Sequence, residues 1–230
     1  GRIAEWQPDK PAVLYLLQRS GEKQTLRTLE LPAGYAYHYA NAYEDAGAIY
    51  LDGFFYDKVP LMGSDEEIRE ELFAGVNPGA FSRFRIDLQT GKVEKQDLWQ
   101  AGFAEFPVID NRVTGEKYEY AYAALRRPEC NATEGIFDSH VSFHIQKGKL
   151  RSEITPLPPG HFGGEPVFVP TGKPGQNLGY LLNIIYDSNS DHSYLGIFDA
   201  AKPDRRAVCE VHVSHRIPYG FHGAWRSGRN

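Results

Sequence analysis

The sequence YHYANAYED at residues 37–45, taken together with PYGFHG at residues 218–223, decides how this chain is interpreted. Each segment places one histidine, His38 or His222, among aromatic and small residues at the edge of a strand-like run. Imidazole is a common neutral ligand for a redox metal, and it needs a stiff, mostly apolar mounting to hold its geometry. A histidine flanked by aromatic residues is also commonly a packed side chain, so the spacing alone leaves both interpretations open.

Short runs of aromatic and aliphatic residues recur along the chain and predict β-strands. Turn residues separate these runs, and residues 87–92 and 146–149 have the glycine placement of hairpin connections. Strands at this frequency indicate a sandwich, a barrel or a propeller. The expected strands cover residues 13–17, 48–51, 81–87, 118–124, 141–145, 180–186 and 194–198.

A single helix is expected, over residues 64–73. Ser64 suits the N-cap position, and Glu67 lies three residues later as its capping-box partner. The acidic residues of this stretch are typical of a face that points into solvent, and no catalytic role is expected for them.

The composition excludes several classes of protein. The chain has 230 residues, of which 41% are hydrophobic and 24% charged, and a formal net charge of -5. Such an acidic balance argues against a nucleic-acid partner. No apolar run approaches the roughly 20 residues of a membrane-spanning helix, and the first residues do not resemble a signal peptide. Cys130 and Cys209 lack the spacing of a zinc site or a disulfide framework, so a cytoplasmic protein is expected.

Four ordered blocks resemble the motifs of one family, the carotenoid cleavage oxygenases. Residues 37–45 are similar to its F-H-x-x-N-A-Y-E-D motif. Residues 105–109 resemble its E-F-P segment, followed by G-x-x-Y-x-Y at residues 115–120. Residues 164–170 match G-E-P-x-F-V-P, and residues 217–223 match the closing P-x-x-x-H-G. The set in this order is far more specific than any one block, and the cyanobacterial apocarotenoid oxygenases are the most similar branch.

The resemblance implies an all-β fold, namely the C-terminal portion of a seven-bladed β-propeller with one short helical insertion. Residues 1–230 would form a single partial domain. Family enzymes are longer and use a set of four histidines, of which His38 and His222 match the third and the fourth. The chain therefore looks like a C-terminal half whose partner is the missing N-terminal half.

The same resemblance implies a cofactor, Fe(2+), held by His38, His222 and two histidines from the missing half. Glu105 and Glu165 lie in the blocks where the family places carboxylates behind its ligands. Each would accept a ring N–H, which fixes the tautomer of the imidazole and raises its basicity. From the residues alone, an exposed glutamate at a strand end is the alternative.

Aromatic side chains near these positions are candidates for the wall of a substrate tunnel. A polyene presents a large apolar area and little to hydrogen-bond, so aromatic and aliphatic residues suit its tunnel. The expected wall residues are Tyr37, Phe106 and Phe221, with ordinary packing as the alternative. Tyr37 stands where the family motif has phenylalanine, which leaves the substrate preference open.

Other polar residues are expected to have structural roles. Glu44 is a weaker third carboxylate, and Asn41 and Asp45 are expected to satisfy backbone groups in the turn that follows them. His140 and His144 are four residues apart, hence on one face of a predicted strand. They are expected to form an exposed pair, able to bind stray zinc weakly.

The activity that the resemblance implies is that of a non-haem Fe(II) dioxygenase. Such an enzyme uses O2 to split a conjugated C=C bond of an apolar polyene, a carotenoid or apocarotenoid, into aldehydes. The alternatives are a stilbene-cleaving dioxygenase of the same family and a noncatalytic propeller or interaction module. A lactone hydrolase propeller is disfavoured, because its metal prefers oxygen ligands. The isolated chain is expected to be inactive, and peripheral membrane contact is expected only through the missing half.

Overall fold

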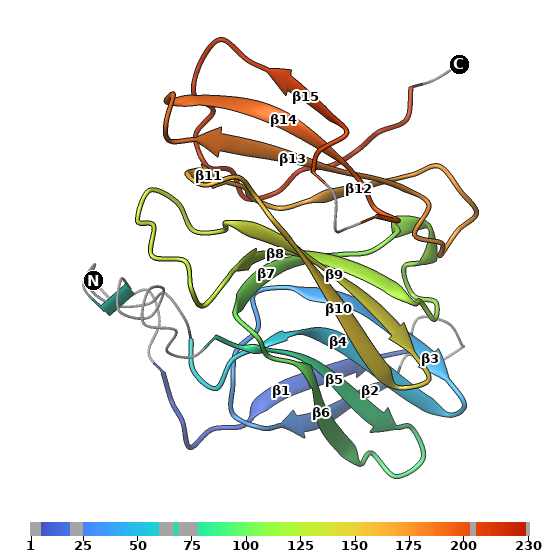
Figure 1. Ribbon diagram of the computed structural model, residues 1–230. Coiled ribbons are helices and arrows are strands. Elements are labelled where there is room, and N and C mark those ends of the chain that lie inside the picture. The colour runs from blue at the N-terminus through green and yellow to red at the C-terminus, as the bar shows by residue number, and fades with distance from the viewer. Residues whose placement is uncertain (1–5, 19–24, 60–66, 69–77, 203–205, 229–230) are drawn as a thin grey trace.

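The computed structural model describes residues 6–18, 25–59, 67–68, 78–202 and 206–228. Within these residues, fifteen strands form four antiparallel sheets. Figure 1 shows the sheets following one another in chain order, from the blue β1–β2 pair to the orange and red strands of the last sheet. None of the described helical residues forms a helix long and apolar enough to cross a membrane.

The chain starts with a short sheet of two strands and continues with three larger sheets, which we call the first, second and third blades. The short sheet consists of β1 (Ala12–Leu17) and β2 (Leu26–Leu31). The first blade is ordered β3 (Tyr39–Asp45), β4 (Ala48–Phe55), β5 (Ala80–Asp87) and β6 (Val93–Trp99). The second blade is ordered β7 (Phe103–Val108), β8 (Tyr120–Arg126), β9 (Ser139–Gln146) and β10 (Lys149–Pro156), with a 3-10 turn, η1 (Asn111–Val113), after β7.

The third blade has two short strands at one edge. β11 (His161–Phe162) and β12 (Val167–Pro170) both pair with β13 (Gly179–Asp187), which continues to β14 (His192–Asp199) and β15 (Cys209–His212). In each blade the first strand along the chain lies at one edge and the last strand at the other. Each blade is thus a meander with four strand positions, of which β11 and β12 share the first in the third blade. This is the blade pattern of a β-propeller, in which the first strands surround the axis.

All seven strands expected from the sequence are present, as parts of β1, β4, β5, β8, β9, β13 and β14, although β8 begins two residues later than expected. Both expected hairpins connect neighbouring strands. The seven expected ranges did not include the other eight described strands, β2, β3, β6, β7, β10, β11, β12 and β15. Of these, β6 and β10 are polar and largely exposed strands at blade edges. Most of the helix expected over residues 64–73 lies outside the described residues. Residues 67–68 are helical.

Aromatic side chains fill the space between the first and second blades. Phe81 stacks on Phe143 with ring centroids 4.8 Å apart, and Trp99 meets the same ring edge-on at 5.3 Å. Phe54 packs against Phe81 at 5.4 Å. Large rings suit this position because two twisted sheets facing each other leave a wide gap, and each ring buries a large apolar area there.

Polar residues of two sequence motifs also join these blades. The amide of Asn41 donates to the carbonyl of Glu116 at 2.9 Å and accepts from the Gly115 amide at 3.0 Å. Asp45 forms an ion pair with Lys117 at 2.8 Å. The expectation that Asn41 and Asp45 satisfy their own turn is therefore wrong, because both side chains reach the loop before β8 instead. Glu44 is exposed, in agreement with a structural rather than a site role.

A buried ion pair lies beneath this link. Arg83 on β5 donates from Nε and Nη2 to the two oxygens of Asp52 on β4, at 2.8 and 2.7 Å. Tyr118, which precedes β8, donates its hydroxyl to Asp52 at 2.6 Å. The guanidinium also lies over the rings of Tyr43 and Tyr50, at 5.9 and 5.5 Å. The first blade is thus tied to the second through one fully bonded carboxylate.

His140 is also placed differently from the sequence-based expectation. It is buried on β9, with its ring edge-on to Phe198 of the third blade at 4.8 Å. Burial lowers the pKa of His140 to about 4, so the ring is neutral near pH 7. His144 stacks on Tyr120 at 4.7 Å. The expected exposed histidine pair is therefore wrong, because the third blade covers this face of β9.

The buried pair yields a stability prediction. Replacing Asp52 by Asn leaves the charge of Arg83 buried without its counter-ion, which should lower the free energy of unfolding by about 3–5 kcal/mol. Urea unfolding, followed by tryptophan fluorescence, measures this loss. Glu94→Gln, which removes the solvent-exposed ion pair with Lys92, is the matched control and should leave the unfolding midpoint unchanged. Equal midpoints for both variants would contradict the assigned role of Asp52.

Candidate metal centre

Two imidazoles from distant parts of the chain meet at the inner edges of the blades. His38 immediately precedes β3, and His222 lies in the segment that follows β15. Their Nε2 atoms are 3.3 Å apart, and the ring planes are inclined at 77°. Two nitrogen ligands of one metal ion lie roughly 3–4.5 Å apart, so this distance fits two ligands of the same ion.

A carboxylate lies behind each ring. Glu105 Oε2, on β7, is 2.7 Å from Nδ1 of His38, and Glu165 Oε1, before β12, is 3.2 Å from Nδ1 of His222. The hydrogen bond to Glu105 raises the pKa of His38, although partial burial of the ring opposes this effect. An ionised carboxylate only accepts hydrogen bonds, so it assigns the proton of each neutral ring to Nδ1.

The assigned tautomers bear on what the pair can bind. With the protons on Nδ1, both Nε2 atoms present lone pairs to each other across 3.3 Å. Two facing lone pairs repel unless a metal cation or a shared proton lies between them. Neutral imidazole with a carboxylate behind it is the usual form of a histidine that ligates a transition metal. The donor set therefore fits a transition-metal ion bound at the two Nε2 atoms.

The two histidines differ in how their carboxylate partners are bonded and in how exposed their rings are. Glu105 is buried, and its carboxylate also accepts the hydroxyl of Tyr56 at 2.9 Å and the amide of Phe106 at 2.8 Å. Glu165 accepts the amide of Gly223 at 2.7 Å. The side chain of His38 is 28% exposed, whereas that of His222 is 58% exposed. His38 is therefore the more enclosed of the two, held by two blades, and His222 lies at the more open side.

Backbone geometry brings His38 and Glu105 into position. A Cβ atom on Gly53 would lie 2.8 Å from the carbonyl oxygen of His38, so glycine is required where β4 passes the start of β3. A bulge interrupts the pairing of β7 with β8 between Glu105 and Val108. Within it Phe106 has a φ of 58°, a conformation that is uncommon outside glycine and marks local strain. The bulge turns the Phe106 amide onto the carboxylate of Glu105.

The expected wall residues are not equivalent. The ring of Phe106 lies 5.1 Å from that of His38 and 5.8 Å from that of His222, so it contacts both imidazoles. Tyr37 lies 6.4 Å from His38 only, and Phe221 lies 6.4 Å from His222 only. Phe221 is 77% exposed. Phe106 is thus the one of the three that closes over the paired rings.

An apolar groove of about 270 Å³ begins beside His222 and Glu165. It lies between the third blade and residues 217–225, which run along the blade without forming a strand. Its apolar lining includes Val167, Leu182, Ile184, Leu195, Pro218 and Trp225. The groove therefore offers an apolar ligand a surface that reaches His222, one of the two histidines.

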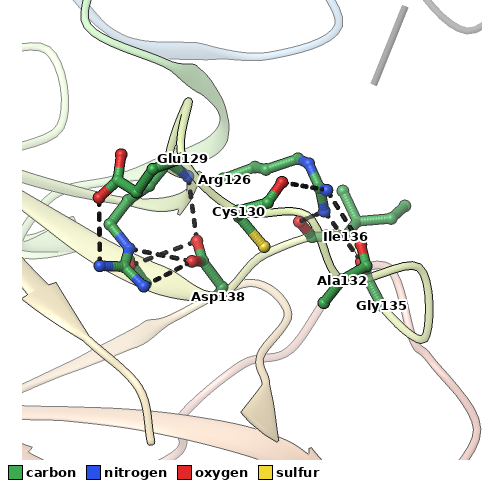
Figure 2. A network of polar contacts seen from close by, with 9 residues as sticks. Arg126, Glu129, Cys130, Ala132, Gly135, Ile136 and Asp138 are labelled. Carbon is green, nitrogen blue, oxygen red and sulfur yellow. Dashed lines mark hydrogen bonds and ion pairs between the residues drawn. The ribbon is translucent and has the colours of Figure 1, made fainter. Parts of the chain in front are cut away.

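The loop between β8 and β9 supports the segment that carries His222. Figure 2 shows the buried guanidinium of Arg126 directed into this loop, where it donates at 2.8–3.2 Å to the carbonyl oxygens of Cys130, Ala132, Gly135 and Ile136. Tyr219 in turn donates to the carbonyl of Glu134 at 2.9 Å. One buried side chain therefore shapes the loop on which the His222 segment rests.

Sequence reasoning missed two residues of the centre. Tyr56 contacts Glu105, and Asn183 on β13 binds both the amide and the carbonyl of Gly164, next to Glu165. Neither belongs to a motif block, because both act through contacts between distant strands. Among the described residues, no group of three or more histidine, cysteine or acidic side chains has the arrangement of a metal site. The part of the chain that the structure describes thus contributes two imidazoles to the centre.

Relatives are found for nearly the whole chain. The family model described as retinal pigment epithelial membrane protein matches residues 1–227. The apocarotenoid-15,15'-oxygenase of Synechocystis sp. is 34% identical over 98% of this chain and 45% of its own length. A carotenoid 9,10(9',10')-cleavage dioxygenase of Arabidopsis thaliana is 28% identical over 96% of this chain and 42% of its own. The isoeugenol monooxygenase of Pseudomonas putida is 26% identical over 98% and 48%, respectively.

The fold has solved counterparts. The crystal structure of cobalt-substituted Synechocystis ACO superposes with a TM-score of 0.83 at 32% identity, over 97% of this chain and 46% of that one. This likeness confirms the expected all-β fold, a portion of the propeller of that family. The chain spans less than half the length of the curated relatives it matches. Since the family model and these relatives match almost every residue, the chain belongs to the carotenoid cleavage oxygenase family.

Proposed function

We propose that this chain forms part of a non-haem Fe(II) dioxygenase that cleaves a conjugated C=C bond of a carotenoid or apocarotenoid. The observation that carries the proposal is the pair of Nε2 atoms 3.3 Å apart, each on a ring with a carboxylate behind it. In the overall reaction the C=C bond and the O–O bond break and two C=O bonds form. Both oxygen atoms enter the two aldehydes, so the reaction needs no further reductant.

The chain's own residues would hold and enclose the metal. His38 and His222 would bind it through Nε2, while Glu105 and Glu165 keep the ring protons on Nδ1. Neutral ligands leave Fe(II) its full charge, and the iron supplies the redox chemistry by which O2 adds across the C=C bond. Phe106 excludes water from the side of the pair that it covers. The other ligands would come from a region that this chain lacks and that the longer relatives contain.

The groove supports an elongated apolar substrate. Its lining is mostly aliphatic and aromatic, and it ends at His222, so a polyene bound along it would direct one double bond to the metal. Tyr37 favours a second candidate substrate, a phenolic stilbene, because a hydroxyl stands where the family motif has a plain ring. The chain can be completed with the matching part of a relative, loaded with iron and assayed under air with a polyene and with a stilbene. The substrate whose absorbance is lost is the one that the protein cleaves.

Removal of either carboxylate tests the metal centre. In a protein completed with the matching part of a relative, Glu105→Gln and Glu165→Gln should each weaken iron binding by roughly 10–100-fold, since the ligand ring loses its acceptor. We expect the larger effect from Glu105, which is the more buried. Iron content after dialysis against a chelator measures the loss.

Glu44→Gln provides the matched control, because Glu44 is an exposed carboxylate on β3, the strand that directly follows His38. It should retain iron as the unsubstituted protein does. Iron retention by both Glu105 and Glu165 variants at the control level would show that these carboxylates do not support the metal.

The isolated chain should not cleave a carotenoid. Two imidazoles hold Fe(II) weakly against water and competing metals, and exposed lining residues such as Phe221 and Trp225 leave the groove open to solvent. Exposed apolar residues on the first and last sheets, such as Tyr15 on β1 and Val211 on β15, support a missing partner surface. Adding the matching remainder of a relative, in cis or as a separate chain, should restore iron binding and O2-dependent loss of polyene absorbance together. Turnover by the isolated chain would contradict this proposal.

A further inference from the structure

Tyr56 lies next to the candidate centre, where its hydroxyl contacts the carboxylate of Glu105. It directly follows β4 and is fully buried. Its Oη lies 2.9 Å from Glu105 Oε1 and 3.0 Å from the carbonyl oxygen of Ala104. A tyrosine hydroxyl has one proton, and the ionised carboxylate is the stronger acceptor, so the proton is assigned to Glu105.

Glu105 accepts hydrogen bonds on both of its oxygens. Oε1 accepts from Tyr56, and Oε2 accepts from the amide of Phe106 and from Nδ1 of His38. The bond to Tyr56 therefore fixes the rotation of the carboxylate about its last torsion angle. Because Glu105 is buried, an Oε1 without a donor is unfavourable, and the carboxylate can find another donor only by turning away from its present orientation.

The second carboxylate has no such support among the described residues. Glu165 Oε2 accepts from the backbone amide of Gly223, and its other oxygen faces His222. A side-chain substitution does not remove a backbone amide donor such as that of Gly223. Both carboxylates thus accept a backbone amide, and the His38 side of the centre has a side-chain hydroxyl in addition.

We propose that Tyr56 is a positioning residue of the metal centre. Its hydroxyl orients Glu105 so that His38 keeps its proton on Nδ1 and presents Nε2 to the metal. The metal-binding part of this inference rests on the proposed function. The effect on the tautomer of His38 does not, because it follows from three hydrogen bonds within the chain itself.

The ring of Tyr56 has a separate packing role. It lies 6.0 Å from Phe103 and 6.2 Å from Tyr37, and a Cβ atom on Gly79 would come within 2.5 Å of it. Tyr56→Phe keeps the ring and removes only the hydroxyl. Tyr118→Phe is the matched control, because Tyr118 is also a buried tyrosine that donates to a buried carboxylate, that of Asp52. That control pair is not hydrogen-bonded to either histidine.

The first measurement is the tautomer of His38, from nitrogen-15 chemical shifts in the metal-free 230-residue chain. The unsubstituted chain and Tyr118→Phe should hold the proton on Nδ1, and Tyr56→Phe should show a mixture of the two tautomers. The second is the dissociation constant for Co(II) in the completed protein. It should rise about tenfold in Tyr56→Phe and stay within about twofold in Tyr118→Phe.

Tyr56→4-aminophenylalanine restores a donor at the same position. It should return His38 to the Nδ1–H tautomer, and it decides the question by itself if Tyr56→Phe does not fold. A mixed tautomer in this folded variant, or an unchanged tautomer in Tyr56→Phe, overturns the proposal. Failure of the unsubstituted completed protein to bind Co(II) would instead contradict the proposed function, while the tautomer measurement still judges Tyr56.

Discussion

The hydrogen bond between Glu105 and His38 is the constraint on which the candidate site depends. A buried carboxylate is unfavourable unless its oxygens are paired, and Glu105 is paired with a hydroxyl, a backbone amide and an imidazole. These donors come from the first and second blades, so the bond forms only when the two blades pack together. The position of His38 is thus a consequence of the interface between blades.

The sequence blocks that suggested chemistry divide into two physical roles. His38, Glu105, Glu165 and His222 gather at the inner blade edges. Asn41 and Tyr118, from neighbouring motifs, instead bind across the blades through a loop backbone and through Asp52. Short motifs in such a fold therefore combine site residues with the residues that fix the blade-to-blade register. Residues of the second kind hold the first kind in place.

Runs of aromatic and aliphatic residues are a local signal, and they predicted many of the central strands. The convergence of the two histidines was expected from the resemblance of the ordered motifs to the family, because spacing alone left it open. It could not predict features that arise from contacts between strands. Tyr56 belongs to an ordinary aromatic run, and its role appears only when β4 passes β7. His140 has the alternation of a half-exposed strand, yet the third blade covers that face. The positive φ of Phe106 occurs in a bulge that the residue types of this segment do not predict.

The central claim is that His38 and His222 share one metal ion. Its most direct test is a crystal structure of the completed protein with iron, using an anomalous-difference map recorded at the iron absorption edge. The account predicts one peak in contact with Nε2 of both histidines, with Glu105 and Glu165 on the far sides of the rings. A peak bound elsewhere, or one that contacts only one of the two histidines, would contradict it.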